Sequence, residues 1–177
     1  DWLPENEQTI EKIVFEKTSS LLNSKIIVSN QASNKILNII KKNILNNNSR
    51  KVICNEQFSC YENENGFIYY EDELGPLKLP KPNLPGEFQI DNISAAIATL
   101  RNLDFQIQEE HFKKGITKIK SIARLQEIKS GKLKNLCKNN KIFVDGSHNP
   151  LGAKVLNNYL DNLNCNKHII LGMMANK

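Results

Sequence analysis

The feature that most constrains the fold of this chain is an alternation of short β-branched runs with longer runs of helical period. Residues 9–22 and 36–45 carry apolar side chains at mostly helical spacing, and Thr9 is placed to cap the first of these helices. A β-branched run follows each of them, at residues 25–29 and 51–54. Strands that alternate with helices predict an α/β fold.

The middle of the chain predicts a hairpin, a connector and two further helices. Residues 58–70 resemble a β-hairpin whose turn contains Gly66. Four prolines between residues 76 and 85 predict an extended connector, because proline lacks the amide hydrogen and fixes its own φ. The Ala-rich run 92–103 and the following residues 109–118 predict helices.

A second α/β unit is predicted near the end of the chain. A polar segment leads into an apolar strand at residues 141–145, a helix at 150–163 and a second strand at 168–172. Strand, helix and strand in this order are typical of the start of a new α/β unit. We therefore expect one domain over residues 1–122 and another over 123–177.

The composition argues against several classes of protein. The 177 residues are 40% hydrophobic and carry a net charge of +5, but no Arg-rich or aromatic-interleaved basic run accompanies the charge. We therefore predict no nucleic-acid binding. The four cysteines lack both the CxxC spacing and the histidine partners of a zinc site, so we expect reduced thiols. Without a signal segment or an apolar run of about 20 residues, we expect a cytoplasmic protein with no membrane span.

The segment from Asp145 to Pro150 joins the apolar strand to the helix that follows it. Ligands of α/β sheets bind beyond the carboxyl ends of strands, and this segment suits a nucleotide. Asp145 can accept hydrogen bonds from ribose hydroxyls, and His148 can donate to a phosphate or orient a neighbour. The same residue types also form Asx-turns and helix caps, so the residues alone leave both interpretations open.

Five segments, in order along the chain, resemble motifs of the Mur ligase superfamily and, within it, of the folylpolyglutamate synthase/dihydrofolate synthase kind. They are residues 9–17, similar to Thr-Ile-x-x-Ile-Ala-x-Glu-Lys; residues 84–92 with the Ala-rich helix, similar to Gly-x-His-Gln-x-x-Asn-Ala-Ala; residues 123–126, similar to Gly-Arg-x-Gln/Glu; residues 145–150, similar to Asp-x-x-His-Asn-Pro; and residues 171–177, similar to Gly-x-x-x-Asp-Lys. Together they span almost the whole chain.

The resemblance implies the C-terminal part of a P-loop-type Mur ligase central ATPase domain, followed by the start of a Rossmann-like C-terminal domain. It also implies a monomeric ligase of folate biosynthesis. ATP would phosphorylate a carboxylate of folate or dihydropteroate, and the amine of L-glutamate would attack the acyl phosphate to form an amide. Mg²⁺ and cationic side chains would neutralise the charge. The alternatives are a Mur-type peptidoglycan ligase, a cyanophycin synthetase and a non-catalytic nucleotide-binding domain.

The resemblance also implies roles for single residues in catalysis and metal binding. Lys17 matches a lysine that is carbamylated, which turns a cation into a carboxylate able to bind Mg²⁺. A helix-surface lysine beside Glu16 is the alternative. His148 is the second residue to which the resemblance gives a catalytic role. Thr18-Ser19-Ser20 replaces the usual Ala-Gly-Ile of the family.

The nucleotide contacts implied by the resemblance involve four residues. Asn92 matches an asparagine whose amide pairs with an adenine edge; the alternative is a helix cap, and the two roles can coexist. Gln89 lies one helical turn earlier and would assist. Arg124 matches an arginine that reaches the ATP phosphates, a task that suits its planar guanidinium, unless it is only a surface arginine. Asp145 matches the acid that faces the ribose.

The chain departs from the family pattern at three further places. Phe88 stands where the family has His, Asn176 stands where it has Asp, and no Gly-rich loop ending in Gly-Lys-Ser/Thr occurs. The chain also begins at Asp1 without Met and stops at Lys177 directly after an apolar run. We therefore expect a fragment, with the phosphate loop and a magnesium-binding histidine upstream and no catalysis by the chain alone.

Overall fold

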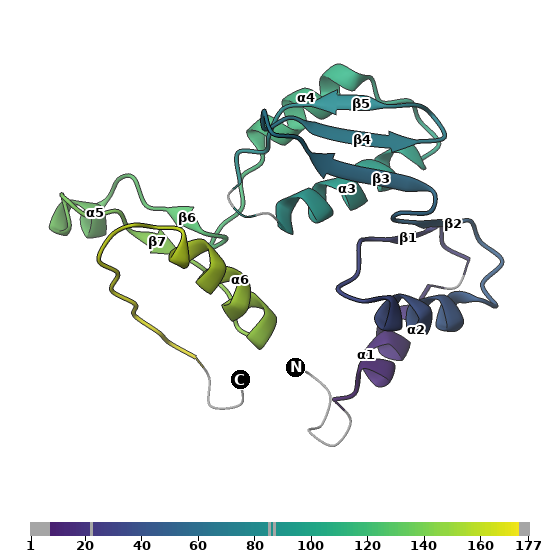
Figure 1. The fold of residues 1–177 in the computed structure, drawn as a ribbon, viewed down its shortest axis with the longest axis horizontal. Coiled ribbons are helices and arrows are strands. Elements are labelled where there is room, and N and C mark those ends of the chain that lie inside the picture. The colour runs from purple at the N-terminus through teal and green to yellow at the C-terminus, as the bar shows by residue number, and fades with distance from the viewer. Residues whose placement is uncertain (1–7, 22, 85, 87, 174–177) are drawn as a thin grey trace. The chain divides into compact units, whose positions relative to one another are not determined.

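The computed structural model describes residues 8–21, 23–84, 86 and 88–173, and Figure 1 labels its helices and strands. The chain forms two compact units: residues up to 81 together with 90–116, and residues 82–89 together with those from 117 onward. The mixed α/β class predicted from the sequence is confirmed. Within the described residues, no helix is both long and apolar enough to cross a bilayer.

The first unit begins with two helices and a pair of parallel strands. These elements are α1 (Ile10–Thr18), β1 (Ile26–Val28), α2 (Asn34–Ile44) and β2 (Lys51–Ile53), in the predicted order. The Thr9 side chain accepts a hydrogen bond of 3.2 Å from the Lys12 amide, so the predicted cap of α1 is confirmed. Ser33 caps α2 in the same way.

Aliphatic side chains hold α2 on the parallel strands. Leu37, Ile40 and Ile44 are three and four residues apart, which puts them on one face of the helix. They pack with side chains of both strands. The buried residues of this core are Ile26, Val28, Ile44 and Ile53, and the partly buried ones are Leu21, Leu37 and Ile40.

An antiparallel sheet follows, with the strand order β3 (Phe58–Glu62), β4 (Ile68–Asp72) and β5 (Leu77–Leu79). The predicted hairpin is confirmed as β3 and β4. Its turn is closed by the Asn63 side chain, which accepts hydrogen bonds from the amides of Asn65 and Phe67. Strand β5 lies in the stretch predicted as an extended connector. Pro76 and Pro80 flank it and leave the three amides between them available for pairing.

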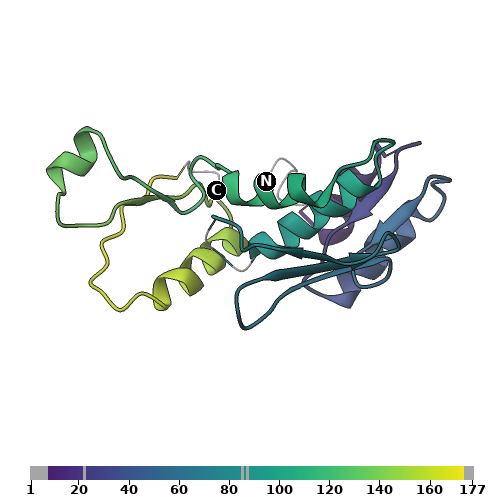
Figure 2. The same ribbon diagram turned by 90° about the horizontal axis from the view of Figure 1, so that it is seen from above.

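Helices α3 (Phe88–Arg101) and α4 (Glu109–Lys118) lie along one side of this sheet (Figures 1 and 2). Ile93, Ile97 and Phe112 are buried there. Helix α4 has its predicted bounds. Helix α3 begins at Phe88 rather than at Asn92, so the interpretation of Asn92 as a helix cap is wrong.

The second unit contains β6 (Gln126–Glu127), α5 (Lys132–Leu136), β7 (Phe143–Val144) and α6 (Pro150–Asp161). Strands β6 and β7 are antiparallel, and neither β6 nor α5 was predicted. Helix α6 is confirmed. The strand predicted at residues 168–172 does not form, and Ile170 there is fully exposed. Because β7 has only two residues, it offers almost no ladder for a parallel neighbour, and the Rossmann-like arrangement stays a prediction.

Candidate functional site

The loop between β7 and α6 holds two of the predicted site residues, Asp145 and His148. Helix α6 starts immediately after Asn149, whose side chain accepts a 2.8 Å hydrogen bond from the Gly152 amide. Pro150 occupies the first turn, where its missing amide hydrogen costs nothing. Asn149 therefore caps the helix, and Asp145 forms an Asx-turn of its own, because its side chain accepts from the Ser147 amide two residues later.

The Asp145 carboxylate accepts hydrogen bonds from three donors of its own chain. One oxygen accepts from the Leu125 amide at 2.8 Å, and the other accepts from the Ser147 amide at 2.8 Å and from the Ser147 hydroxyl. Burial acts to raise the pKa of Asp145, but these hydrogen bonds and the Arg124 charge outweigh it, so the pKa lies below its ordinary value. Asp145 is therefore an anion whose position is fixed by hydrogen bonds.

Arg124 lies in a turn with an unusual backbone. Its neighbours Ala123 and Leu125 have φ values of 53° and 47°, in the left-handed region that costs a non-glycine residue about 1–2 kcal/mol. The turn is fixed by hydrogen bonds from the Gly146 amide to the Ala123 carbonyl at 2.8 Å and from the Ala123 amide to Gln126 at 3.0 Å. The Leu125 side chain is buried, whereas Arg124 is exposed. An exposed guanidinium on a fixed turn can bind an anionic group.

His148 lies exposed on the same loop, with its Nδ1 3.1 Å from the Gly146 carbonyl. A carbonyl oxygen can only accept a hydrogen bond, so Nδ1 carries the proton in this arrangement. Gly146 thus contacts both candidate groups, because its amide holds the Ala123 turn while its carbonyl orients His148. The structure brings Arg124, Asp145 and His148 together.

Two other candidates, Gln89 and Asn92, lie in the first turns of α3. They are three residues apart, so their side chains are neighbours on the helix surface. Gln89 is buried and Asn92 is exposed. Phe88, which replaces the usual His, starts the helix and is partly buried. Its ring lies so close to Gly86 that a Cβ there would approach it to 2.3 Å.

Lys17 lies in the last turn of α1 and is exposed. The hydroxyls of the residues after it bond to the end of this helix: Thr18 donates to the Val14 carbonyl at 2.8 Å, and Ser19 donates to that of Glu16 at 2.9 Å. In place of the Ala-Gly-Ile of the family, Thr-Ser-Ser therefore supplies the Ser19 hydroxyl as a donor for the Glu16 carbonyl, one of the last carbonyls of the helix. Asn176 lies outside the described residues.

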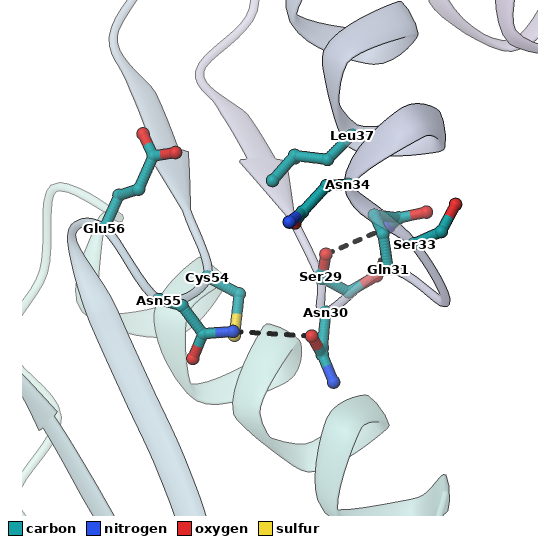
Figure 3. A pocket seen from close by; sticks show the side chains of 9 residues that line it. All are labelled: Ser29, Asn30, Gln31, Ser33, Asn34, Leu37, Cys54, Asn55 and Glu56. Atoms are coloured by element: carbon teal, nitrogen blue, oxygen red, sulfur yellow. Dashed lines mark hydrogen bonds between the residues drawn. The ribbon is translucent and has the colours of Figure 1, made fainter.

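A pocket of about 220 Å³ lies in the first unit, at the carboxyl ends of β1 and β2 (Figure 3). Its polar side chains come from the segments after the two strands and from the start of α2, and its residues are Ser29, Asn30, Gln31, Ser33, Asn34, Leu37, Cys54, Asn55 and Glu56. This pocket was not predicted from the sequence. The signal was present, since each apolar strand is followed by a polar run, as at Asp145.

Comparisons with known proteins give structural matches only. No family model matches the chain, and no curated protein sequence matches it. Solved structures of folylpolyglutamate synthases match closely in fold. E. coli FolC in complex with DHPP and ADP has a TM-score of 0.72 at 19% identity, over 93% of this chain and 37% of that one.

Two further structures agree with this match. Mycobacterium tuberculosis folylpolyglutamate synthase, complexed with ADP and AMPPCP, has a TM-score of 0.70 at 19% identity, over 92% of this chain and 36% of that one. An FPGS–AMPPCP–folate complex has a TM-score of 0.67 at 21% identity, over 87% and 38%. The chain thus spans little more than a third of each protein. Over most of its length, the chain has the fold of one part of folylpolyglutamate synthase.

Proposed function

We propose that the protein to which this chain belongs is an ATP-dependent ligase that adds L-glutamate to a folate or dihydropteroate carboxylate through an acyl phosphate. The observation that carries the proposal is the grouping of Asp145 and His148, on one strand–helix loop, with Arg124 on the turn beside it, in a chain with the fold of folylpolyglutamate synthase. Structures with that fold hold ADP, AMPPCP, folate or DHPP, which supports a nucleotide and a folate compound as substrates.

Each loop residue has a task in this reaction. The folate carboxylate attacks the γ-phosphorus of ATP and ADP leaves; the amine of glutamate then attacks the acyl carbon and phosphate leaves. Arg124 would bind the transferred phosphate, where charge accumulates. His148 would donate to the phosphates from its ring. Asp145 has about four acceptor positions, of which three are filled, so it has room for one ribose hydroxyl.

Asn92 and Gln89 would contact the adenine, since a carboxamide can both donate to a base edge and accept from it. Asn92 is exposed in the second turn of α3. The boundary between domains 1–122 and 123–177, the monomeric state and the cytoplasmic location complete the proposal.

The proposed Mg²⁺ ligand is a carbamate on Lys17. In the described part of the chain, no group of three His, Cys, Asp or Glu side chains could hold a metal ion. Mg²⁺ is usually held by only one or two carboxylates together with substrate phosphates, so a single carbamate on the exposed Lys17 fits such a site. Bound there, the ion would neutralise phosphate charge.

Intact-mass measurement of the complete protein in bicarbonate should detect one added carbon dioxide, which the Lys17→Ala variant should lack. An equal gain of mass in that variant would contradict the assignment.

The function is tested by assaying the complete protein with ATP, glutamate and either tetrahydrofolate or dihydropteroate. We expect ADP release that depends on both other substrates, together with a product one glutamate heavier. Arg124→Ala should reduce kcat/KM for ATP by about tenfold to a hundredfold, and Arg124→Lys by less. Arg50→Ala is the matched control, because Arg50 pairs with the exposed Glu73 in the first unit. Activity with a muramyl peptide instead would overturn the proposal.

A further inference from the structure

The direction of the Arg124 side chain depends on the backbone of its two neighbours. Ala123 and Leu125 both have positive φ, and neither is glycine. If either residue relaxed to a negative φ, the peptide planes beside Arg124 would rotate and its side chain would point elsewhere. Strained residues of this kind persist only where the surrounding structure holds them, and they cluster at functional sites.

Two side chains supply this restraint, one from the residue that follows the turn and one from the loop before α6. Gln126 accepts from the Ala123 amide at 3.0 Å, and Asp145 accepts from the Leu125 amide at 2.8 Å, so one side chain holds each strained residue. The Gly146 amide holds the Ala123 carbonyl, and a Cβ at Gly146 would lie 3.3 Å from that oxygen. The buried Leu125 side chain anchors the other end.

We infer that Asp145 and Gln126 are positioning residues, whose side chains hold the turn 123–125 so that Arg124 points toward an anionic group. The inference rests on the proposed function only for the identity of that group as a phosphate of ATP. It gives Gln126 a role that its place on β6 does not suggest, and it gives Asp145 a task besides any contact with a ribose.

Amide hydrogen exchange tests the restraint itself, without any nucleotide. In the complete protein, Asp145→Ala should speed exchange of the Leu125 amide by about tenfold to a hundredfold, the range expected for one hydrogen bond to a charged acceptor. Gln126→Met should speed exchange of the Ala123 amide by about twofold to tenfold, and Gln126→Glu, which keeps an oxygen at that position, should change it little. Glu127→Ala is the control, because Glu127 is the exposed neighbour on β6. Unchanged exchange at both amides would overturn the inference.

ATP kinetics test the link to Arg124. Gln126→Met should lower kcat/KM for ATP by about twofold to tenfold with the melting temperature nearly unchanged, because it redirects the side chain that binds the transferred phosphate. Adding Ala123→Gly should recover part of the loss, since glycine reaches this φ without strain. In a double-mutant cycle, Asp145→Ala combined with Arg124→Ala should cost less than the sum of the single changes.

The two proposals fail in different ways. Fully additive losses in the cycle would mean that Asp145 acts on the nucleotide directly and would overturn its positioning role. If the complete protein neither binds AMPPCP nor turns over ATP, the proposed ligase function fails, while the exchange of the Leu125 and Ala123 amides still decides whether the turn is held as inferred.

Discussion

At the scale of single residues, the Asp145 carboxylate combines several hydrogen bonds with a nearby positive charge. Two amides and a hydroxyl donate to it, and Arg124 adds a nearby positive charge. Only the ionised form can accept from all of these donors at full strength. The ionisation state of Asp145 therefore couples the loop before α6 to the turn around Arg124, which lies about 20 residues earlier in the chain.

This coupling predicts that Asp145 contributes to the stability of the fold in a pH-dependent way. Its pKa in the folded protein lies below the ordinary value of 3.8. The contribution is therefore fully present above that value and is lost as the pH falls through the lower, folded-state pKa. Urea unfolding should show that Asp145→Asn lowers the free energy of unfolding at pH 7. In acid, the difference in free energy of unfolding between this variant and the unchanged protein should become smaller. Glu127→Gln is the control, and a gap that stayed constant down to the lowest pH would contradict the prediction.

The four thiols provide a second prediction at this scale. All four are free, Cys165 is exposed, and burial raises the pKa of both Cys54 and Cys60, that of Cys60 to about 12. Because the thiolate is the reactive form, iodoacetamide at pH 8 should label Cys165 first and Cys54 and Cys60 last, more than about tenfold more slowly. Peptide mass spectrometry measures the order. In urea the four rates should converge, and early labelling of Cys60 in the folded protein would contradict the burial.

The sequence predicted the site at this scale only in part. The strand-to-helix position of Asp145 and His148 was visible because apolar runs and helix caps leave local signals. The φ angles of Ala123 and Leu125 were not, because no local pattern marks a strained alanine or leucine. The partners of Asp145 were equally hidden, since they depend on which distant backbone the fold brings near.

At the scale of elements, an ion pair ties helix α3 to the antiparallel sheet. Arg101 at the end of α3 lies 3.0 Å from Asp72 at the end of β4, with side chains only 11% and 6% exposed. Arg101 also donates to the Gly75 carbonyl at 2.8 Å, and the Tyr70 hydroxyl donates to Asp72 at 2.9 Å. The helix that carries Gln89 and Asn92 is thus fixed to the sheet at its far end.

Breaking this ion pair should strongly destabilise the folded protein. Asp72→Asn leaves a nearly buried guanidinium without its charged partner, so it should lower the free energy of unfolding by about 3–5 kcal/mol. Glu73→Gln is the matched control, because it breaks the exposed pair of Glu73 with Arg50 and should cost less than about 1 kcal/mol. Urea unfolding of both variants makes the comparison. Equal losses would mean that the ion pair does not hold α3.

The cap of α6 gives another prediction about an element. Asn149→Ala removes the acceptor for the Gly152 amide and should cost about 0.5–2 kcal/mol, whereas Asn149→Ser keeps an oxygen there and should cost less. Thermal unfolding followed by circular dichroism measures both. A loss that is the same for both variants would contradict the cap as the cause.

Most elements could be predicted from the sequence because their signals are local. Helix α4 begins with two glutamates and ends with a lysine, and α6 follows an Asn-Pro cap. The failures have a common cause. Strand β5 between two prolines forms because β4 offers a partner, and the apolar residues 168–172 form no strand because β7 offers almost none. Pairing partners lie far away in the sequence, so periodicity alone could not decide either case.

At the scale of the whole molecule, the two units differ in how much apolar surface they bury. The core side chains of the first unit come from all five of its strands and from helices that include α2, α3 and α4. In the described part of the second unit, only Pro82, Gln89 and Leu125 are buried, and no residue of α5 or α6 is. Exposed Leu151, Ile169 and Ile170 lie in the same unit.

This contrast predicts unequal local stability. Segments with few buried apolar contacts open at low free-energy cost, so in the 177-residue chain the amides of α6 should exchange at least about a hundredfold faster than those in the second half of α3. Hydrogen-exchange mass spectrometry of the chain alone and of the complete protein separates two causes. Protection of α6 that rises in the complete protein would mean that further residues cover its apolar side chains. Equal and strong protection of α6 and α3 in the chain alone would contradict the prediction, because α6 has no buried residue and should open at a lower free-energy cost than α3.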